Sequence, residues 1–155
     1  MDRKGMKKVK LFDELTDDEL TIMSGVLRKK HYGKGKKIFK EGEAGETLHI
    51  ISKGEVKVCK VGPTGDLQTL TLLKDGDICG EMSFLDGRPH TATLIAIIDT
   101  EIYQIERKDF EGLIETSPFL VYKVMRNIVF NVHSIVRGMN TKYMEMINYM
   151  WGRRR

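Results

Sequence analysis

The sequence has little of what would stabilise a small secreted protein or bind a metal. Its 155 residues include two cysteines, Cys59 and Cys79, which define neither a disulfide framework nor a metal-binding motif. The most apolar region, 120–136, is interrupted by Lys123 and Arg126, which argues against a membrane span. The amino-terminus is basic but lacks the apolar stretch of a signal peptide. These absences favour a cytoplasmic protein whose cysteines are small buried hydrophobes.

Charge is spread unevenly along the chain, although a formal net charge of +4 would suggest a nucleic-acid partner. Residues 1–10 are rich in lysine and arginine, and the chain ends Arg153-Arg154-Arg155. The sequence between these ends is mildly acidic. We therefore expect residues 1–10 and 152–155 to be solvated basic tails on a domain that has no basic surface of its own.

Short runs rich in Val, Ile, Leu and Thr alternate with turn residues across the middle of the chain. They span 26–32, 37–40, 47–52, 55–61, 67–74, 92–98 and 101–105. Most of the fifteen glycines fall between Gly33 and Gly87, and glycine supplies the positive φ that tight turns need. Many short strands at nearly even spacing predict a sandwich, barrel or roll.

Helical patterns flank this region on both sides. Thr16 and Glu19 have the spacing of a capping box, which predicts a short helix through about residue 25. A second short helix is expected over 107–116, and Ser117-Pro118 ends it because the residue before proline avoids the α region. From Pro118 to about residue 150, apolar residues recur every three or four positions, which predicts one long helix.

The long helix is too long to be covered by a small domain. At a rise of ~1.5 Å per residue it would span about 50 Å. We therefore expect self-association of its apolar seam as a two-helix coil, and the alternative is a helix that packs over its own roll. Gly138 in its middle indicates either close backbone approach or a bend. The seam comprises Met125, Ile128, Val132, Ile135, Met139, Tyr143, Met146 and Met150.

The segment 76–93 carries the chemistry. Gly80, followed by the residues 81–85, predicts one tight helical turn that opens at a glycine. The first amides of such a turn have no partner inside it and present the positive end of the helix dipole to an anion. Ser83 and Thr91 add hydroxyl donors, whereas Glu81 would repel a phosphate and suits a sugar hydroxyl instead. In isolation, the segment also fits an ordinary β-turn-helix connection.

Several motifs in a characteristic order give this segment its context. They are Leu11-Phe12, Gly33-Lys34-Gly35, Glu41-Gly42-Glu43-Ala44-Gly45, Ile50-Ile51-Ser52-Lys53-Gly54-Glu55-Val56, Gly76-Asp77, Gly80-Glu81 and Pro89-His90-Thr91-Ala92-Thr93. From about residue 11 to 135 the sequence resembles the cyclic nucleotide-binding domain family, which includes bacterial catabolite activators, kinase regulatory subunits and gated channels. The resemblance implies a mainly β fold: an antiparallel β-roll over 11–117 with flanking helices, followed by the long helix over 118–151.

The resemblance also implies a ligand and the residues that bind it. The ligand would be cyclic AMP, cyclic GMP or a related phosphate-bearing molecule, and the segment 80–92 would be the phosphate-binding cassette. Glu81 would meet the ribose 2′-hydroxyl, and the amides of Met82 and Ser83, with Thr91, would meet the cyclic phosphate. The predicted ligand-binding residues are Gly80, Glu81, Met82, Ser83, Arg88, His90, Thr91, Ala92 and Ser134.

Two positions depart from the family's pattern. His90 stands where relatives that bind cyclic nucleotides usually have an arginine. A charge-assisted bond from such an arginine contributes about 1.5–3 kcal/mol, so its replacement by histidine weakens ligand binding. Arg88 is the nearby cation that could compensate. On the long helix, the stretch that contacts the base falls at 134–136, where Ser134 is the only polar residue.

Three functions compete. The first is a non-catalytic sensor that needs no cofactor and forms a homodimer through 118–150. Ligand binding would move the hinge at Ser117-Pro118 and thereby signal to an unidentified downstream protein. The second is a dimeric interaction module whose pocket no longer binds nucleotide, which the replacement by His90 supports. The third is a cupin-type metalloenzyme, against which the wide spacing of the four histidines argues. They are His31, His49, His90 and His133.

Direct binding of DNA is not expected from the sequence. The bacterial activators continue past the long helix into a helix-turn-helix module, and the residues after 152 leave no room for one.

Overall fold

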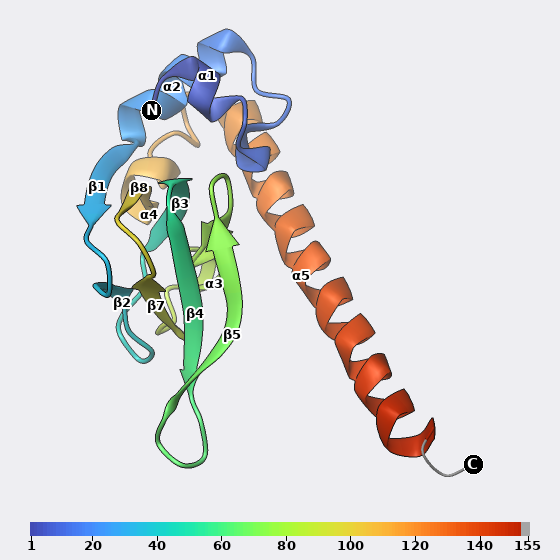
Figure 1. Ribbon diagram of the computed structural model, residues 1–155. Coiled ribbons are helices and arrows are strands. Elements are labelled where there is room, and N and C mark those ends of the chain that lie inside the picture. The colour runs from blue at the N-terminus through green and yellow to red at the C-terminus, as the bar shows by residue number, and fades with distance from the viewer. Residues whose placement is uncertain (153–155) are drawn as a thin grey trace.

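Two four-stranded antiparallel sheets form a β-roll in the computed structural model, which describes residues 1–152 (Figure 1). The first sheet has the order β1-β8-β3-β6, with β1 Arg28–Tyr32, β8 Thr100–Glu106, β3 Thr47–Lys53 and β6 Ile78–Cys79. The second has the order β2-β7-β4-β5, with β2 Lys37–Phe39, β7 Thr93–Ala96, β4 Glu55–Val61 and β5 Leu67–Lys74. The predicted antiparallel β-roll is confirmed.

The strand predictions are accurate where alternation is regular and miss the shortest strand. Strands β4 and β5 match their predicted ranges, while β1 begins at Arg28 because Val26 and Leu27 end the preceding helix. Strand β6 was not predicted, since two residues carry no period. It nevertheless matters, because its pairing with β3 places Gly80 beside the first sheet.

The amino-terminal segment is folded, so the prediction that residues 1–10 form a solvated tail is wrong in part. Helix α1 (Arg3–Met6) and the 3-10 helix η1 (Lys10–Phe12) follow each other, and Met6 and Val9 are buried in the main core. The lysine side chains of this segment are exposed. A short amphipathic segment therefore contributes apolar residues to the core while its charges stay in water. Of the predicted tail over 152–155, Gly152 is instead the last residue of the carboxy-terminal helix, and 153–155 lie outside the described residues.

Helix α2 (Asp17–Val26) begins at the predicted capping box. The amide of Glu19 donates to Oγ1 of Thr16 at 3.2 Å, and the amide of Thr16 donates to the Glu19 carboxylate at 2.8 Å. The same carboxylate accepts from Nζ of Lys123 at 2.8 Å. The cap therefore also ties α2 to the carboxy-terminal helix.

Two helices follow the roll. Helix α4 (Arg107–Glu111) is shorter than the predicted range 107–116, because the chain continues in turns to residue 116. Helix α5 (Pro118–Gly152) then runs without a break, starting beside the amino-terminal helices and diverging from the strands of the roll towards its carboxyl end (Figure 1). Over the described residues, none of the helices combines the length and the apolar character needed to cross a membrane.

The core has two parts, and both cysteines are buried as expected. The larger part joins the amino-terminal segment, α2, the first sheet and the start of α5. The smaller part lies in the roll around Ile51, Val56 and Leu94, with Cys79 among them. The cassette segment lies where β6 leaves this second part, so its position is fixed from both sheets.

Candidate ligand-binding site

A short helix, α3 (Glu81–Asp86), begins directly after β6, as the sequence predicted. Its amino-terminal cap is Gly80, which has a left-handed φ of 78°. A methyl group on Gly80 would lie 3.0 Å from the main-chain oxygen of Thr47 and 3.2 Å from Nδ1 of His49. A side chain at this position is therefore opposed both by backbone strain and by close neighbours.

The first amides of α3 are available to a ligand. The amide of Phe84 closes the first turn on the Gly80 carbonyl at 2.9 Å. Within residues 1–152, the amides of Met82 and Ser83 have no hydrogen-bond acceptor. Unpaired amides at the positive end of a helix dipole bind negative charge. The Glu81 carboxyl beside them is half-buried, and burial raises its pKa above the ordinary value.

Three segments meet beside this turn: the β2–β3 loop, α3 and the stretch that returns to β7. Gly45 lies at the meeting point, because a methyl group there would collide with Cβ of Ser83 and lie 2.7 Å from Cε1 of His90. Main-chain bonds fix the return stretch, since the His90 amide donates to the Glu43 carbonyl and the Gly42 amide donates to the His90 carbonyl, each at 2.8 Å. Gly45 is thus necessary for the close approach of Ser83 and His90.

His90 lies inside this arrangement as a neutral ring. Its side chain is 6% exposed and stacks on Phe39, with the ring centroids 3.8 Å apart and the planes at 11°. His49 also contacts Phe39, with ring centroids 5.2 Å apart and planes tilted by 51°, and its Nδ1 has no partner in the described part of the chain. Burial lowers the pKa of His90, and burial together with the nearby His90 lowers the pKa of His49 to about 4. The position of the family's arginine therefore carries no charge at neutral pH.

The histidines are not arranged for a metal. Among residues 1–152, no three His, Cys, Asp or Glu side chains are grouped closely enough to bind a metal ion.

The remaining cassette residues are more exposed. The Arg88 side chain is 84% exposed and its Nε lies 3.6 Å from the Asp86 carboxylate, so it points away from His90's enclosure into solvent. Met82 is 53% exposed, Thr91 is exposed and Ala92 is half-buried. The compact part of the predicted set is therefore Gly80, Glu81, Ser83 and His90, with Met82 contributing its main chain.

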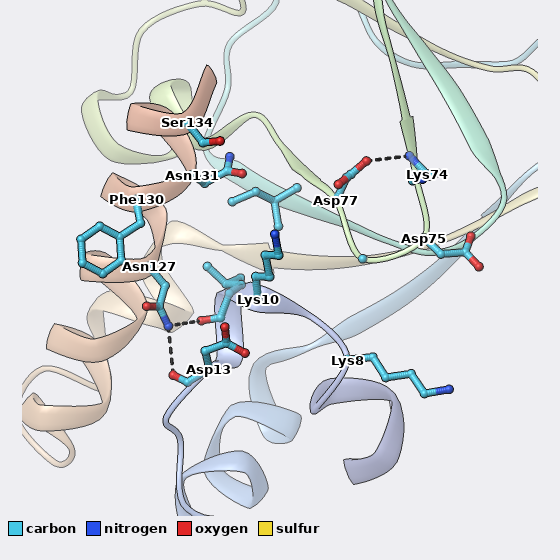
Figure 2. A pocket seen from close by; sticks show the side chains of 13 residues that line it. Lys8, Lys10, Asp13, Lys74, Asp75, Asp77, Asn127, Phe130, Asn131 and Ser134 are labelled. Atoms are coloured by element: carbon cyan, nitrogen blue, oxygen red, sulfur yellow. Dashed lines mark hydrogen bonds between the residues drawn. The ribbon is translucent and has the colours of Figure 1, made fainter. Parts of the chain in front are cut away.

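The structure does not bring Ser134 to the cassette. Its side chain lies on an exposed part of α5 and lines an open cleft of about 560 Å³ (Figure 2). The other walls of this cleft are the amino-terminal segment and the turn between β5 and β6, and no cassette residue lines it.

The carboxyl end of α3 is connected to α4 through Arg107. Gly87, which ends α3 with a left-handed φ of 69°, leaves room for the guanidinium: a methyl group there would lie 2.7 Å from Nη1 of Arg107. The same guanidinium donates to the Glu46 carboxylate at 2.9 Å, and the Arg107 amide donates to the Glu46 carbonyl at 2.8 Å. One side chain thus contacts the cassette, the β2–β3 loop and the start of α4.

Sequence reasoning missed four residues of the site. Gly45 belongs to the motif 41–45, one of the motifs on which the family resemblance rests. That motif was the signal from which its part in the site could have been predicted. Thr93 is buried and its hydroxyl accepts from the Glu41 amide at 3.0 Å, which fixes the loop from the β7 side. Phe39 and His49 had no signal in the sequence, because their stacking with His90 arises only when β2, β3 and the return stretch come together.

Comparisons with known proteins agree with this architecture. The sequence model of the cyclic nucleotide-binding domain family matches residues 29–117 of this chain. The cyclic AMP receptor protein of Thermus thermophilus is 32% identical over 119 residues, which are 77% of this chain and 55% of that protein. The cGMP-dependent protein kinase egl-4 of Caenorhabditis briggsae is 30% identical over 111 residues, 70% of this chain but 15% of the kinase. The chain thus spans about half, or much less, of the length of these relatives.

Solved structures give the same result. A cyclic nucleotide-binding domain from Methylobacillus flagellatus superposes with a TM-score of 0.83 at 26% identity, over 92% of this chain and 80% of that one. The Thermus thermophilus catabolite activator protein superposes with a TM-score of 0.77 at 28% identity, over 88% of this chain and 62% of that one. From the match over more than half of its length, the chain belongs to the cyclic nucleotide-binding domain family.

Proposed function

We propose that this protein is a non-catalytic regulatory domain that binds a cyclic nucleotide at α3 and signals through α5. The observation that carries the proposal is the pair of unpaired amides of Met82 and Ser83 behind the left-handed Gly80. The ligand's cyclic phosphate is assigned to these amides and to the exposed Thr91 hydroxyl. The Glu81 carboxylate accepts from the ribose 2′-hydroxyl, a role that a half-buried acceptor next to the amides suits.

His90 makes the binding depend on pH. In the free protein burial lowers its pKa, so the ring is neutral near pH 7. A bound phosphate would favour the charged imidazolium and raise that pKa, so binding would take up a proton. Affinity is therefore expected to be higher at pH 6 than at pH 8. An arginine at this position would carry its charge at both values of pH.

The route from ligand to α5 is proposed to pass through Arg107. A ligand that moves α3 also moves Gly87, against which the Arg107 guanidinium lies, and Arg107 begins α4. The turns 112–116 then connect α4 to Pro118 at the start of α5. A shift of α4 would change the angle at which α5 leaves the roll, and a separate downstream protein would read that angle.

We propose that α5 pairs with the α5 of a second copy. The seam predicted from the sequence needs one correction, because Ile128 is fully buried in the protein's own core together with Leu120 and Val124. A different set of apolar residues is exposed or half-exposed and follows a strict alternation of three and four. This set comprises Tyr122, Met125, Val129, Val132, Val136, Met139, Tyr143, Met146 and Met150. The set covers more than three heptads, and valine occupies two of its a positions, Val129 and Val136. This pattern favours a two-stranded coiled coil.

Calorimetric titration with cyclic AMP and with cyclic GMP at pH 6 and pH 8 tests the ligand proposal. We expect saturable binding that is tighter at pH 6, and a heat that changes with the ionisation enthalpy of the buffer. The variant His90→Arg is expected to gain roughly 10- to 150-fold in affinity and to lose the pH dependence. His31→Arg, on the exposed face of β1, serves as the matched control and should titrate like the unmodified protein.

A second function, a dimeric interaction module that binds no nucleotide, is favoured by one observation. The neutral His90 is stacked on Phe39 and packed against Gly45, so it already has good apolar contacts without a ligand. This function predicts a melting temperature that millimolar cyclic AMP or cyclic GMP leaves unchanged, while the α5 dimer persists. Such a result for both nucleotides at both values of pH would rule out the ligand proposal and leave this one.

A further inference from the structure

The cleft beneath α5 is large enough for a small molecule and is distinct from the cassette. Its volume of about 560 Å³ lies within the range of known ligand sites, ~300–1,000 Å³. One wall is a polar face of α5, formed by Asn127, Asn131 and Ser134 at helical spacing. Figure 2 shows these side chains together with Phe130 on the helix. The opposite walls are the amino-terminal segment and the β5–β6 turn.

The walls are anchored, so the cleft is a fixed feature of the fold. Nδ2 of Asn127 donates to the carbonyls of Leu11 and Asp13, both at 3.0 Å, and joins α5 to η1. At the other wall, the Asp77 carboxylate accepts from the Lys74 amide at 2.9 Å. The left-handed Gly76 in the same turn lies against the Lys8 carbonyl, at 3.6 Å from a methyl group placed on it. The Asn127 side chain thus joins α5 to the amino-terminal segment, and Gly76 brings the β5–β6 turn close to the same segment.

Two donors in the cleft walls, Nδ2 of Asn131 and Nζ of Lys10, have no partner among the described residues. Nδ2 of Asn131 is buried and has no hydrogen-bond partner within residues 1–152, although it lies in the wall of an open cleft. Lys10 forms no ion pair with any described residue, and Figure 2 shows it rising from the amino-terminal segment into the cleft, while Lys8 points away from it. The charged groups in the cleft walls are Lys8, Lys10, Lys74, Asp13, Asp75 and Asp77.

The aspartates of the turn are less available than the lysines. Asp75 accepts from the Gly54 amide at 2.8 Å, and Asp77 is occupied by the Lys74 amide. The Asp13 carboxylate has no such bond among the described residues. All three aspartates keep their negative charge, because an accepted hydrogen bond does not neutralise a carboxylate, so the formal charges of the three lysines and three aspartates in the cleft walls balance. An orphaned buried amide together with an unpaired ammonium group is satisfied by an acceptor that carries negative charge.

The cleft also lies on a different face of α5 from the proposed dimer seam. In the heptad register of the seam, Asn127, Asn131 and Ser134 occupy the same positions as the buried Leu120 and Val124. They therefore project to the side of α5 that faces the roll. Pairing of two α5 helices would therefore leave the cleft open.

We propose that this cleft is a second ligand site, which binds a small carboxylate- or phosphate-bearing molecule between Lys10 and Asn131. Such a molecule contacts α5, η1 and the β5–β6 turn at once. It fixes the angle of α5 relative to the roll independently of the cassette. The site requires neither nucleotide binding nor dimer formation.

Nuclear magnetic resonance on protein labelled with ¹⁵N-asparagine tests this site, with citrate and inorganic pyrophosphate as probes. We expect the Asn131 side-chain amide to shift along a saturable curve with at least one of the two probes. Lys10→Met and Asn131→Leu should each weaken that binding about tenfold or more. Lys36→Met, which replaces an exposed lysine of the β1–β2 connection that does not line the cleft, is the matched control and should leave the curve unchanged.

A cassette variant separates this site from the cyclic nucleotide site. In Glu81→Ala/His90→Ala the titration of the Asn131 amide should be unaffected, whatever the outcome with cyclic AMP. If that variant abolishes the shift, the probes bind at the cassette and the proposal fails. It fails equally if neither probe gives a saturating shift, or if Lys10→Met, shown by circular dichroism to be folded, titrates like the unmodified protein.

Discussion

The two halves of α5 have the same apolar period and opposite surroundings. In the first half, Leu120, Val124 and Ile128 are at most 1% exposed, and Lys123 and Asn127 are bonded to α2 and η1. In the second half, Met139 and Tyr143 are 64% and 59% exposed. Period alone therefore states that a helix has an apolar face, but not which part of the molecule covers that face.

The difference has a local cause. The first half is covered because the amino-terminal segment folds back, so that Met6, Val9 and Leu11 join the same core as the start of α5. No segment among residues 1–152 lies over the second half in this way. An apolar helical surface of this length without a cover is unusual for a monomer, and it supports a second copy as its partner.

The largest effect is expected from a charge in the exposed half. Val136→Glu would place a carboxylate in the proposed seam of each helix, and an uncompensated buried charge costs about 3–5 kcal/mol. The dimer's dissociation constant should rise roughly 100- to 5,000-fold, measured by sedimentation equilibrium. Thr141→Glu places the same charge outside the seam and should leave the constant unchanged. A Val136→Glu protein that sediments like the unmodified dimer would refute the seam.

The next largest effect is expected in the buried half. Ile128→Ala removes a fully buried side chain and should lower the free energy of unfolding by about 2–5 kcal/mol. Ile135→Ala, seven residues or about two helical turns further along α5 and 47% exposed, should change it by less than about 1 kcal/mol. Both are measured by urea unfolding in the Val136→Glu background, so that dimer formation does not contribute. Equal losses would show that the two halves are not different in the monomer.

A smaller effect is expected from pH. Acid should lower the free energy of unfolding of the roll, to which the first half of α5 is anchored. His49 has a folded-state pKa of about 4, below its unfolded value near ~6.5, so its neutral form stabilises the fold fully above pH 6.5. That contribution is lost as the pH falls from 6.5 towards 4, by at most about 3 kcal/mol.

Unfolding measured between pH 7 and pH 4.5 tests this, with His49→Gln expected to flatten the decline. His31→Gln replaces an exposed histidine of β1 and should retain the slope of the unmodified protein. An unchanged slope in His49→Gln would contradict the assignment to this buried ring. His90, whose pKa is also lowered, contributes in the same direction and remains in both variants.

The smallest effect concerns Gly138 in the exposed half. No atom of the described residues lies within 4 Å of a methyl group placed on it, and α5 continues through it as helix. Close approach within the protein's own chain is therefore not its role, and Gly138→Ala should raise the free energy of unfolding by about 0.5–1 kcal/mol. Gly35→Ala, equally unhindered but at a φ of 80°, should lower it. A loss of stability in Gly138→Ala would indicate that a second copy approaches there.

Much of this fold could be predicted because each pattern reports on local backbone. The capping box at Thr16, the strands β4 and β5 and the turn at Gly80 all depend on residues close in sequence, and the structure has each of them. The same limit explains the failures. Residues 1–10 were predicted to be solvated because most of them are charged. Two apolar residues among them, Met6 and Val9, are buried because the start of α5 packs in the same core.

The candidate site divides in the same way. The cassette residues from Gly80 to Ser83 are contiguous and could be identified from the sequence. The surroundings of His90 depend on Phe39, Gly45 and His49, which belong to other segments. Ser134 was assigned by counting residues along α5, which does not give the direction in which the helix leaves the roll. That direction places Ser134 in the cleft beside the amino-terminal segment and not at the cassette.

The absence of a side chain at Gly45 has a consequence for how this site can evolve. Because a Cβ at position 45 would collide with both Ser83 and His90, any substitution there changes the space available to two residues that are about forty positions away. A family member with a larger residue at 45 requires a smaller one at 83 or a ring turned out at 90. Positions 45, 83 and 90 are therefore expected to mutate as a set, and their joint pattern would identify other chains that share this neutral histidine arrangement.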